Sequence, residues 1–399
     1  MNTQTQQHVV IIGGGYAGMI AAARLARGSD AKITLIDAKA EFVQRIRLHE
    51  LLAGSPQRRF AYGPLLQRRG MRFVQGWVDR LDPHGQRVIG RDAAGADFAI
   101  PYDVLIVALG SRTSAALPGA AQHALRLDDP AQVAAAHDRI TEIAARNGRV
   151  VVVGGGLTGI ETATELAERM PSLRIQLITS GAFAADYSTG GAEHLRGRLQ
   201  QLNVDLIEHA AVAAVDVDRV WLGNGTALPF DQCVWTAGFE VPPLARASGL
   251  AVDRIGRIIT TPTLQTPDHA NIFAAGDAAV ALIDGQPLRM SCAAAMPMGA
   301  HAGMNVRDLI RNKPLRAFDF GFVIRCISLG RKEALVQFVA PDDAPRPRVA
   351  TGWPARWAKA AICRLTYDAI GYELRWGVPL VTWTGGAQSD PQPVQEQRV

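Results

Sequence analysis

The sequence predicts an α/β protein in which one parallel-sheet domain is inserted into another and a C-terminal module follows. Two observations support this fold class. A buried strand, a glycine turn and a helix occur at residues 8–27 and again at residues 150–169, so the chain repeats one supersecondary unit. A third short strand, NIFAA, ends in Gly276 and Asp277, and a helix begins behind it.

The first unit has the glycine spacing of a dinucleotide-binding turn. The strand VVII leads into Gly13-x-Gly15-x-x-Gly18 and a helical run. The first glycine makes the turn, the second admits a pyrophosphate, and the third lets helix pack on strand. A second strand, KITLID, ends in Asp37, whose carboxylate can bind a ribose. The unit predicts a dinucleotide with its phosphates at the helix N-terminus, the alternative being a tight βα turn without a ligand.

The second unit repeats the turn but lacks the acid. A valine strand precedes Gly154-x-Gly156-x-x-Gly159, and aligning RIQLITS on KITLIDA places Thr179 where Asp37 stands. A carboxylate at this position favours NAD because it repels a 2′-phosphate, and no arginine follows nearby to bind one. We therefore expect a second nucleotide site with weak discrimination between NADH and NADPH.

Composition limits the class of protein. A chain of 399 residues with 48% apolar and 20% charged residues suits two or three globular domains. The net charge of +5 comes from scattered arginines, which does not indicate nucleic acid as a partner. We find no secretory signal and no apolar run of the ~18 residues that cross a bilayer. We expect a cytoplasmic protein, either soluble or peripheral on the cytoplasmic face of the membrane.

The cysteines are too far apart for a recognisable metal or redox motif. No C-x-x-C pair occurs among Cys233, Cys292, Cys326 and Cys363. This spacing argues against a disulfide framework, a thiolate metal site and a dithiol redox centre. We expect four reduced, mostly buried thiols and no metal.

Two other segments supply candidate ligand contacts. We expect a short helix over residues 42–52, where His49 is equally well explained as a cofactor contact or as an ordinary polar residue. The strand YDVLIVALGS ends at Gly110, where a small residue lets a ligand approach. Residues 71–101 predict an antiparallel meander with turns at 82–83 and 94–95.

Three motifs, GGGYAG with Asp37, GGGLTGIE and NIFAAGDAA, resemble the FAD-dependent pyridine nucleotide-disulfide oxidoreductase superfamily over residues 8–340. The resemblance implies two Rossmann-like dinucleotide-binding domains, one for FAD and one for NAD(P)H, the second inserted in the first. It implies an FAD domain at 1–117 and 250–315, an NAD(P)H domain at 118–249, a C-terminal interface or membrane-contact module at 316–384, and a disordered tail at 385–399.

The same resemblance assigns roles by motif. It implies that FAD is bound by Gly13, Gly15, Gly18, Asp37, Gly110, Gly276 and Asp277. It implies that NAD(P)H is bound by Gly154, Gly156 and Gly159, with Thr179 setting the nucleotide preference. Glu161 matches a glutamate that the family places near the nicotinamide–flavin junction, which makes it the candidate catalytic residue. An equal alternative is that Glu161 has only a structural role, as an acid near a helix N-terminus that the helix dipole favours.

The missing cysteine pair selects a branch of the superfamily. Dithiol reductases carry a pair soon after the first acid, and sulfide:quinone reductases depend on cysteines near the flavin in a pattern that this chain does not match. The chain therefore resembles the type II NADH dehydrogenase branch. Those relatives usually carry a glutamine at the start of the helix after the third motif, where this chain reads CAAAMPM from Cys292.

These features predict an FAD-dependent NAD(P)H oxidoreductase. Hydride passes from nicotinamide C4 to flavin N5, and the reduced flavin passes electrons to an acceptor, expected to be a quinone. The flavin carries the chemistry, so the protein needs only to position the reactants, tune the flavin and exclude competing reactions. The alternatives are a soluble flavin oxidoreductase acting on a specialised small molecule or a protein partner, and a flavin-binding redox sensor.

Four of the seven tryptophans lie in the last 47 residues. Spacing at i, i+4 predicts a helix with one apolar side, formed by Trp353, Trp357, Ala361, Leu365 and Ala369. Arg356 and Lys359 are expected roughly opposite. This layout suits a helix in a membrane interface. The alternative is packing on the FAD domain or on a second subunit of a homodimer.

Overall fold

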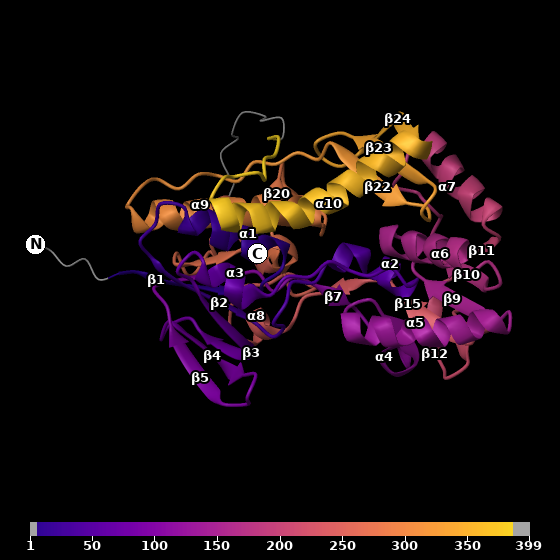
Figure 1. Cartoon of the computed structure of the whole chain (residues 1–399), viewed down its shortest axis with the longest axis horizontal. Helices are drawn as coiled ribbons and strands as arrows, with labels where there is room; N and C mark the ends of the chain where they lie inside the picture. The colour runs from indigo at the N-terminus through magenta and orange to yellow at the C-terminus, as the bar shows by residue number, and fades with distance from the viewer. Residues whose placement is uncertain (1–5, 386–399) are drawn as a thin grey trace, which may run out of the picture.

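The computed structural model describes residues 6–385. Two sheets, each with helices on its faces, form two lobes, and the long helix α10 (Gly352–Trp376) runs along one side of the molecule (Figure 1). The α/β fold with two parallel-sheet units is as predicted. Beyond Gly385, the tail expected at 385–399 lies outside the described residues.

The first sheet contains the first glycine unit at its centre. Its seven strands follow the order β18 (Ile272–Ala274), β6 (Val104–Val107), β1 (His8–Ile12), β2 (Lys32–Asp37), β3 (Arg72–Asp82), β4 (Arg87–Asp92) and β5 (Asp97–Pro101). The strands from β18 to β3 are parallel, whereas β4 and β5 form the expected antiparallel meander. The meander extends the sheet because β3 also pairs with β2.

Helices α1 (Tyr16–Ala26) and α9 (Cys292–Ile310) pack closely against each other. A Cβ atom at Gly299 would lie 2.1 Å from the carbonyl oxygen of Ala17, and one at Gly303 would lie 2.5 Å from that of Ala21. Only glycine permits this approach. Helix α9 is thereby held against the helix that follows the first glycine turn.

The second sheet repeats this arrangement around the second glycine unit. Its five strands are all parallel, in the order β11 (Val204–Ile207), β10 (Arg174–Ile178), β9 (Arg149–Val153), β15 (Gln232–Trp235) and β8 (Ala124–Arg126). Its main helices are α5 (Pro130–Ala145), α6 (Leu157–Arg169) and α7 (Thr189–Gln201). The chain enters and leaves this lobe through the paired strands β7 (Arg112–Thr113) and β16 (Phe239–Glu240).

The remaining elements are short. They comprise a separate sheet of β12 (Val212–Val215), β13 (Arg219–Leu222) and β14 (Ala227–Pro229). They also include α3 (Tyr62–Gln67), α4 (Ala120–His123), α8 (Leu244–Ala247), η2 (Gly276–Ala278), β17 (Ile258–Ile259), β19 (Ala279–Val280), β20 (Leu282–Ile283) and β21 (Gln286–Pro287).

Two segments from outside the second lobe's stretch of sequence, α2 (Leu48–Leu52) and the C-terminal module, contribute to its hydrophobic core. The helix expected over residues 42–52 is shorter than predicted, a 3-10 turn η1 (Arg45–Arg47) followed by α2. Leu48 and Leu52 of α2 are fully buried in this core. Ile327 and Leu335, from the C-terminal module, are also fully buried there.

The C-terminal module is an antiparallel sheet of β22 (Ile324–Ser328), β23 (Ala334–Val339) and β24 (Pro345–Thr351), followed by α10. The inner side of α10 packs into the core of the first lobe through Tyr367, Ile370 and Leu374. None of the described helices is both long enough and apolar enough to cross a membrane.

The predicted apolar side of α10 is partly wrong. Trp353, Trp357, Ala361 and Leu365 are exposed, but Ala369 is buried. Each step of four residues advances about 40° around a helix axis, so four steps carry a position from the outer side to the inner side. Lys359, expected roughly opposite the tryptophans, lies on the opposite side as predicted and points into the protein.

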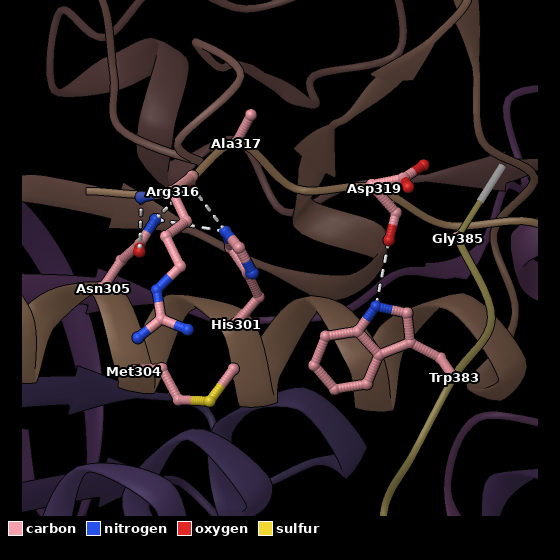
Figure 2. Close-up of a pocket in the computed structure, with 8 residues that line it drawn as sticks. All are labelled: His301, Met304, Asn305, Arg316, Ala317, Asp319, Trp383 and Gly385. Atoms are coloured by element: carbon pink, nitrogen blue, oxygen red, sulfur yellow. Dashed lines mark hydrogen bonds between the residues drawn. The ribbon is translucent and has the colours of Figure 1, made fainter. Parts of the chain in front are cut away.

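Residues 377–385 return across α9 and close a small pocket of about 240 Å³ (Figure 2). Trp383 Nε1 donates a hydrogen bond to the Asp319 carbonyl oxygen at 2.9 Å. From α9, His301 Nε2 and Asn305 Nδ2 both donate to the carbonyl oxygen of Arg316, at 2.8 and 2.9 Å. The buried polar groups of α9 thus hold the following segment in place.

A buried ion pair fastens α10 to α1. Arg24 Nε lies 2.6 Å from Glu373 Oε2, and Arg24 Nη2 lies 2.9 Å from Glu373 Oε1. Glu373 Oε1 also accepts hydrogen bonds from the backbone N–H groups of Leu380 and Val381. The side chains of Arg24 and Glu373 are 10% and 2% exposed.

Arg24→Met should destabilise the protein by about 3–5 kcal/mol, because it leaves the Glu373 carboxylate buried without its cation. Urea unfolding of the FAD-loaded protein measures the loss. Arg364→Met is the matched control, since Arg364 is exposed and pairs with Asp368 across one turn of the same helix. The control should lose less than about 0.5 kcal/mol. Equal losses in the two variants would contradict the prediction.

Candidate functional site

The carboxyl ends of four parallel strands bring the first set of predicted residues to one edge of the sheet. Gly13 follows β1, Asp37 ends β2, Gly110 lies beyond β6, and Gly276 and Asp277 follow β18. In open α/β sheets, ligands bind at this edge, where the strand order reverses. Here the reversal lies at β1, between β2 and β6.

The first glycine turn has the geometry that the spacing predicts. Gly13 has φ +98°, and a Cβ there would lie 2.3 Å from the Ala108 carbonyl oxygen. A Cβ at Gly18 would lie 1.9 Å from the Gly13 carbonyl oxygen. A Cβ at Gly15, in contrast, would meet nothing within 4 Å. Gly13 and Gly18 are therefore required for packing, whereas Gly15 leaves space for a ligand.

Asp37 is fixed beside this turn. Its Oδ2 accepts a hydrogen bond from the backbone N–H of Gly14 at 2.6 Å, and its Oδ1 accepts one from that of Lys39 at 2.8 Å. Burial raises the pKa of Asp37, and these two hydrogen bonds oppose that rise. The carboxylate is thus held at the edge of the pocket.

A pocket of about 410 Å³ opens in front of these residues. Its polar lining includes Gly15, Asp37, Lys39, Arg45, Ser111 and Asp128. The open Gly15 backbone, the adjacent helix N-terminus and two cationic side chains suit a pyrophosphate, and Asp37 suits a ribose. The residues present therefore fit the adenosine diphosphate part of FAD.

Asp277 is tied to this pocket through Ser111. The Ser111 hydroxyl donates a hydrogen bond to Asp277 Oδ2 at 2.7 Å. Arg45 Nη1 donates to the carbonyl oxygen of Ser111, and Arg45 Nη2 lies 2.9 Å from Asp128 Oδ1. Sequence reasoning did not select Ser111 or Asp128, because no motif contains them. Gly276 faces α1, since a Cβ there would lie 2.9 Å from Ala17 Cβ.

The second glycine turn repeats the geometry of the first. Gly154 has φ +118°, and a Cβ at Gly159 would lie 1.8 Å from the Gly154 carbonyl oxygen. A Cβ at Gly156 would meet nothing within 4 Å. Thr179 lies beside the turn, because a Cβ at Gly155 would be 2.7 Å from Thr179 Cβ. Thr179 therefore occupies the position that Asp37 holds in the first unit.

Glu161 lies on α6, one turn beyond the second glycine motif, and contacts the C-terminal module. Its Oε1 lies 2.9 Å from Lys359 Nζ and accepts a hydrogen bond from the Ser328 backbone N–H at 3.0 Å. Its Oε2 lies 3.8 Å from His49 Nδ1. Burial alone would lower the pKa of Lys359, but its neighbours, first among them the Glu161 carboxylate, together outweigh burial and raise that pKa. The structure thus brings together Glu161, His49 and Lys359.

A sequence model of the pyridine nucleotide-disulphide oxidoreductase family matches residues 7–299. The chain belongs to this family. It is an oxidoreductase with FAD and NAD(P)H as its cofactors.

Individual relatives cover nearly the whole chain. An NADH dehydrogenase-like protein of Mycobacterium tuberculosis is 32% identical over 89% of this chain and 92% of its own length. A type II NADH:quinone oxidoreductase of Haemophilus influenzae is 26% identical over 91% of this chain and 94% of its own. The sulfide:quinone oxidoreductase of Aquifex aeolicus has the same fold, with a TM-score of 0.79, 22% identity, and 92% of each chain covered.

Three thiols of this oxidoreductase surround Lys359. Cys292 opens α9, Cys326 lies in β22, and Cys363 lies one turn after Lys359 on α10. Lys359 Nζ also donates a hydrogen bond to the Cys326 carbonyl oxygen at 3.3 Å. Burial raises the pKa of Cys292 to about 12 and that of Cys363 to about 11, and Lys359 opposes both shifts. The thiols are therefore protonated at neutral pH, and all four cysteines are free.

Asp277→Ala should weaken FAD binding roughly tenfold to hundredfold, because it removes a charge-assisted hydrogen bond worth ~1.5–3 kcal/mol. Titration of the apoprotein with FAD, followed by flavin fluorescence, measures the dissociation constant. Ser111→Ala is the matched control: it keeps the carboxylate and removes only the hydrogen bond that orients it, so its loss should be smaller. Unchanged affinity in Asp277→Ala would show that Asp277 does not bind flavin.

Thr179→Glu should shift the oxidoreductase toward NADH, chiefly by raising KM for NADPH, because a carboxylate there repels the 2′-phosphate. Steady-state kinetics with both nucleotides measure the shift. Ser180→Glu is the control, since it adds the same charge one residue beyond the position equivalent to Asp37. A wild type that already prefers NADH by ~100-fold in kcat/KM, on the order of 2.7 kcal/mol, would show that another group discriminates.

Proposed function

We propose that this oxidoreductase passes electrons from NAD(P)H to a lipophilic quinone at a membrane surface. The observation that carries the proposal is the two-sided character of α10. Its outer side presents a row of exposed apolar side chains, and its inner side places Lys359 beside Glu161. A single helix therefore joins a surface suited to lipid with a buried charged group suited to quinone chemistry.

The outer side of α10 fits a membrane interface. Trp353, Trp357 and Trp376 are each 64–68% exposed, and Leu365 is 58% exposed. Tryptophan favours the interfacial region because its ring is amphipathic. The outer positions also include Arg356, Arg364 and Arg375, which would attract anionic lipid. Burial of the opposite side of α10 in the core leaves only this side to meet a bilayer.

The inner side of α10 provides a hydrogen-bond donor for the acceptor. Bound FAD supplies the transfer of reducing equivalents between nicotinamide and acceptor. Negative charge develops on the oxygens of a quinone as it takes up electrons, and the Lys359 ammonium can donate a hydrogen bond to such an oxygen. Glu161 keeps Lys359 charged in the buried site. The charge of Lys359 acts on the Cys292 thiol at the start of α9, the region where the resembling branch usually carries a glutamine, and Lys359 would supply a hydrogen-bond donor in that region.

The relatives support this substrate class. The Haemophilus influenzae relative is named for NADH:quinone oxidoreduction and aligns with 91% of this chain. The Mycobacterium tuberculosis relative is named NADH dehydrogenase-like and aligns with 89%. Both alignments are long enough to include most of the C-terminal module.

The double variant Trp353→Ser, Trp357→Ser should bind anionic vesicles about 10- to 100-fold more weakly, because each indole removed from the interface loses about 1.5 kcal/mol of apolar burial. NADH oxidation with a long-chain quinone in vesicles should fall with it. Ferricyanide reduction should not change, because this acceptor is water-soluble. Point substitutions are preferable to truncation of residues 353–399, which would also remove Lys359 and Glu373.

Val217→Ser is the control, because Val217 is 76% exposed on the other lobe and far in sequence from α10. It should bind vesicles and reduce quinone as the wild type does. A wild type that reduces ferricyanide but ignores vesicles and quinones would refute the proposal and indicate a soluble oxidoreductase with another acceptor.

A further inference from the structure

Arg331, in the turn between β22 and β23, ties the C-terminal module, whose helix α10 packs into the first lobe, to α2 and α6 in the core of the second lobe. Its Nη2 lies 2.9 Å from Oε2 of Glu50, on α2, and 3.0 Å from the Ser55 hydroxyl. Its Nε lies 2.6 Å from Oε1 of Glu165, on α6. Its backbone N–H donates to Oε1 of Glu168, also on α6, at 2.6 Å. One residue of the C-terminal module therefore joins α2, in the FAD-binding half of the chain, to α6.

Two of the acids that Arg331 contacts, Glu165 and Glu168, belong to a row along α6. Glu161, Glu165 and Glu168 are spaced at i, i+4 and i+7, so they lie on one side of the helix. All three are engaged by the C-terminal module, Glu161 through Ser328 and Lys359 and the other two through Arg331. We name this set the α6 acid row. Two of its members are buried: Glu161 is 6% exposed and Glu165 is 1% exposed.

Apolar packing and directed hydrogen bonds both act on α6. Leu48 and Leu52 of α2 fill the core of the second lobe together with Ile327 and Leu335 of the C-terminal module. Hydrophobic contact is non-directional, so the direction in which the C-terminal module holds α6 is set by the hydrogen bonds. An arginine that bridges two carboxylates has defined directions for each hydrogen bond. Glu50 is itself held by Arg47 at 2.6 Å, which fixes the other end of the bridge.

We propose that Arg331 is a positioning residue that sets α6, and with it the bound nicotinamide, at the distance and angle needed for hydride transfer to the flavin. The open Gly156 marks the N-terminus of α6 as the place where the nucleotide pyrophosphate binds. A small rotation of α6 therefore moves the whole nucleotide. Displacement of reacting groups by 1 Å can cost about 100-fold in rate. The proposal concerns the NAD(P)H half-reaction and is independent of the acceptor.

The test is anaerobic stopped-flow reduction of the FAD-loaded full chain by NADH. In Arg331→Met, the limiting rate of flavin reduction should fall about 10- to 100-fold, while the dissociation constant for NADH stays within about threefold. The long-wavelength charge-transfer absorbance between nicotinamide and flavin should weaken in parallel. Arg331→Lys should be intermediate, because an ammonium cannot bridge both carboxylates with fixed geometry.

Two further variants separate positioning from stability. Arg146→Met removes an exposed ion pair with Asp231 that lies within the second lobe, so its limiting rate and charge-transfer absorbance should equal those of the wild type. Arg331→Met leaves the buried Glu165 carboxylate with only the more distant Arg169, 3.8 Å away, and the double variant Arg331→Met, Glu165→Gln removes that buried charge. Its melting temperature should recover toward the wild type, while its limiting rate stays low.

Three results would overturn the proposal. The first is a limiting rate in Arg331→Met within about threefold of the wild type. The second is a loss that lies entirely in the dissociation constant for NADH. The third is a double variant that recovers both stability and rate, which would show that Arg331 acts only by neutralising buried charge. Each result leaves the proposal of a quinone acceptor untouched, because quinone reduction is measured separately.

Discussion

The ion pair between Lys359 and Glu161 is the interaction on which the rest of the site depends. It places a charged lysine from α10 against a carboxylate from α6, inside the protein. Neither charge could stay buried alone, because the desolvation of an unpaired charge costs several kcal/mol. The pair therefore requires α10 and α6 to be present together. The C-terminal module is for this reason part of the proposed site rather than an appendage.

Helix α10 combines three roles because its sides face different environments. Its inner side joins the core of the first lobe and is fastened by Arg24 and Glu373. Lys359 reaches toward the second lobe, and the tryptophans remain exposed. A helix held in the core at one side cannot roll. The exposed tryptophans therefore keep a fixed orientation relative to Lys359, as delivery of a lipophilic acceptor requires.

The dinucleotide sites were predictable because their chemistry is local. The roles of Gly13, Gly15 and Gly18 follow from backbone geometry within a single turn, and the same holds for the second unit. Asp37 and Thr179 are placed by the pairing of adjacent parallel strands, which the repeated pattern implies. The meander at 71–101 likewise follows from alternation and turn residues. Where residues close together in the sequence create the geometry, the sequence is enough to predict it.

The remaining features needed the tertiary structure, because residues far apart in the chain create them. The predicted position of Ala369 was wrong, since a step of four residues drifts around the helix and tertiary packing decides which side is buried. Lys359 lies opposite the tryptophans as predicted, but its partner Glu161 could not be foreseen. Arg331 joins Glu50 to Glu165 across more than a hundred residues of sequence, and no motif marks such a contact. The sequence alone determined the fold class, the two cofactors and the glycine turns. The contacts of the C-terminal module with the two lobes were decided by the burial and pairing of charges that only the folded chain brings together.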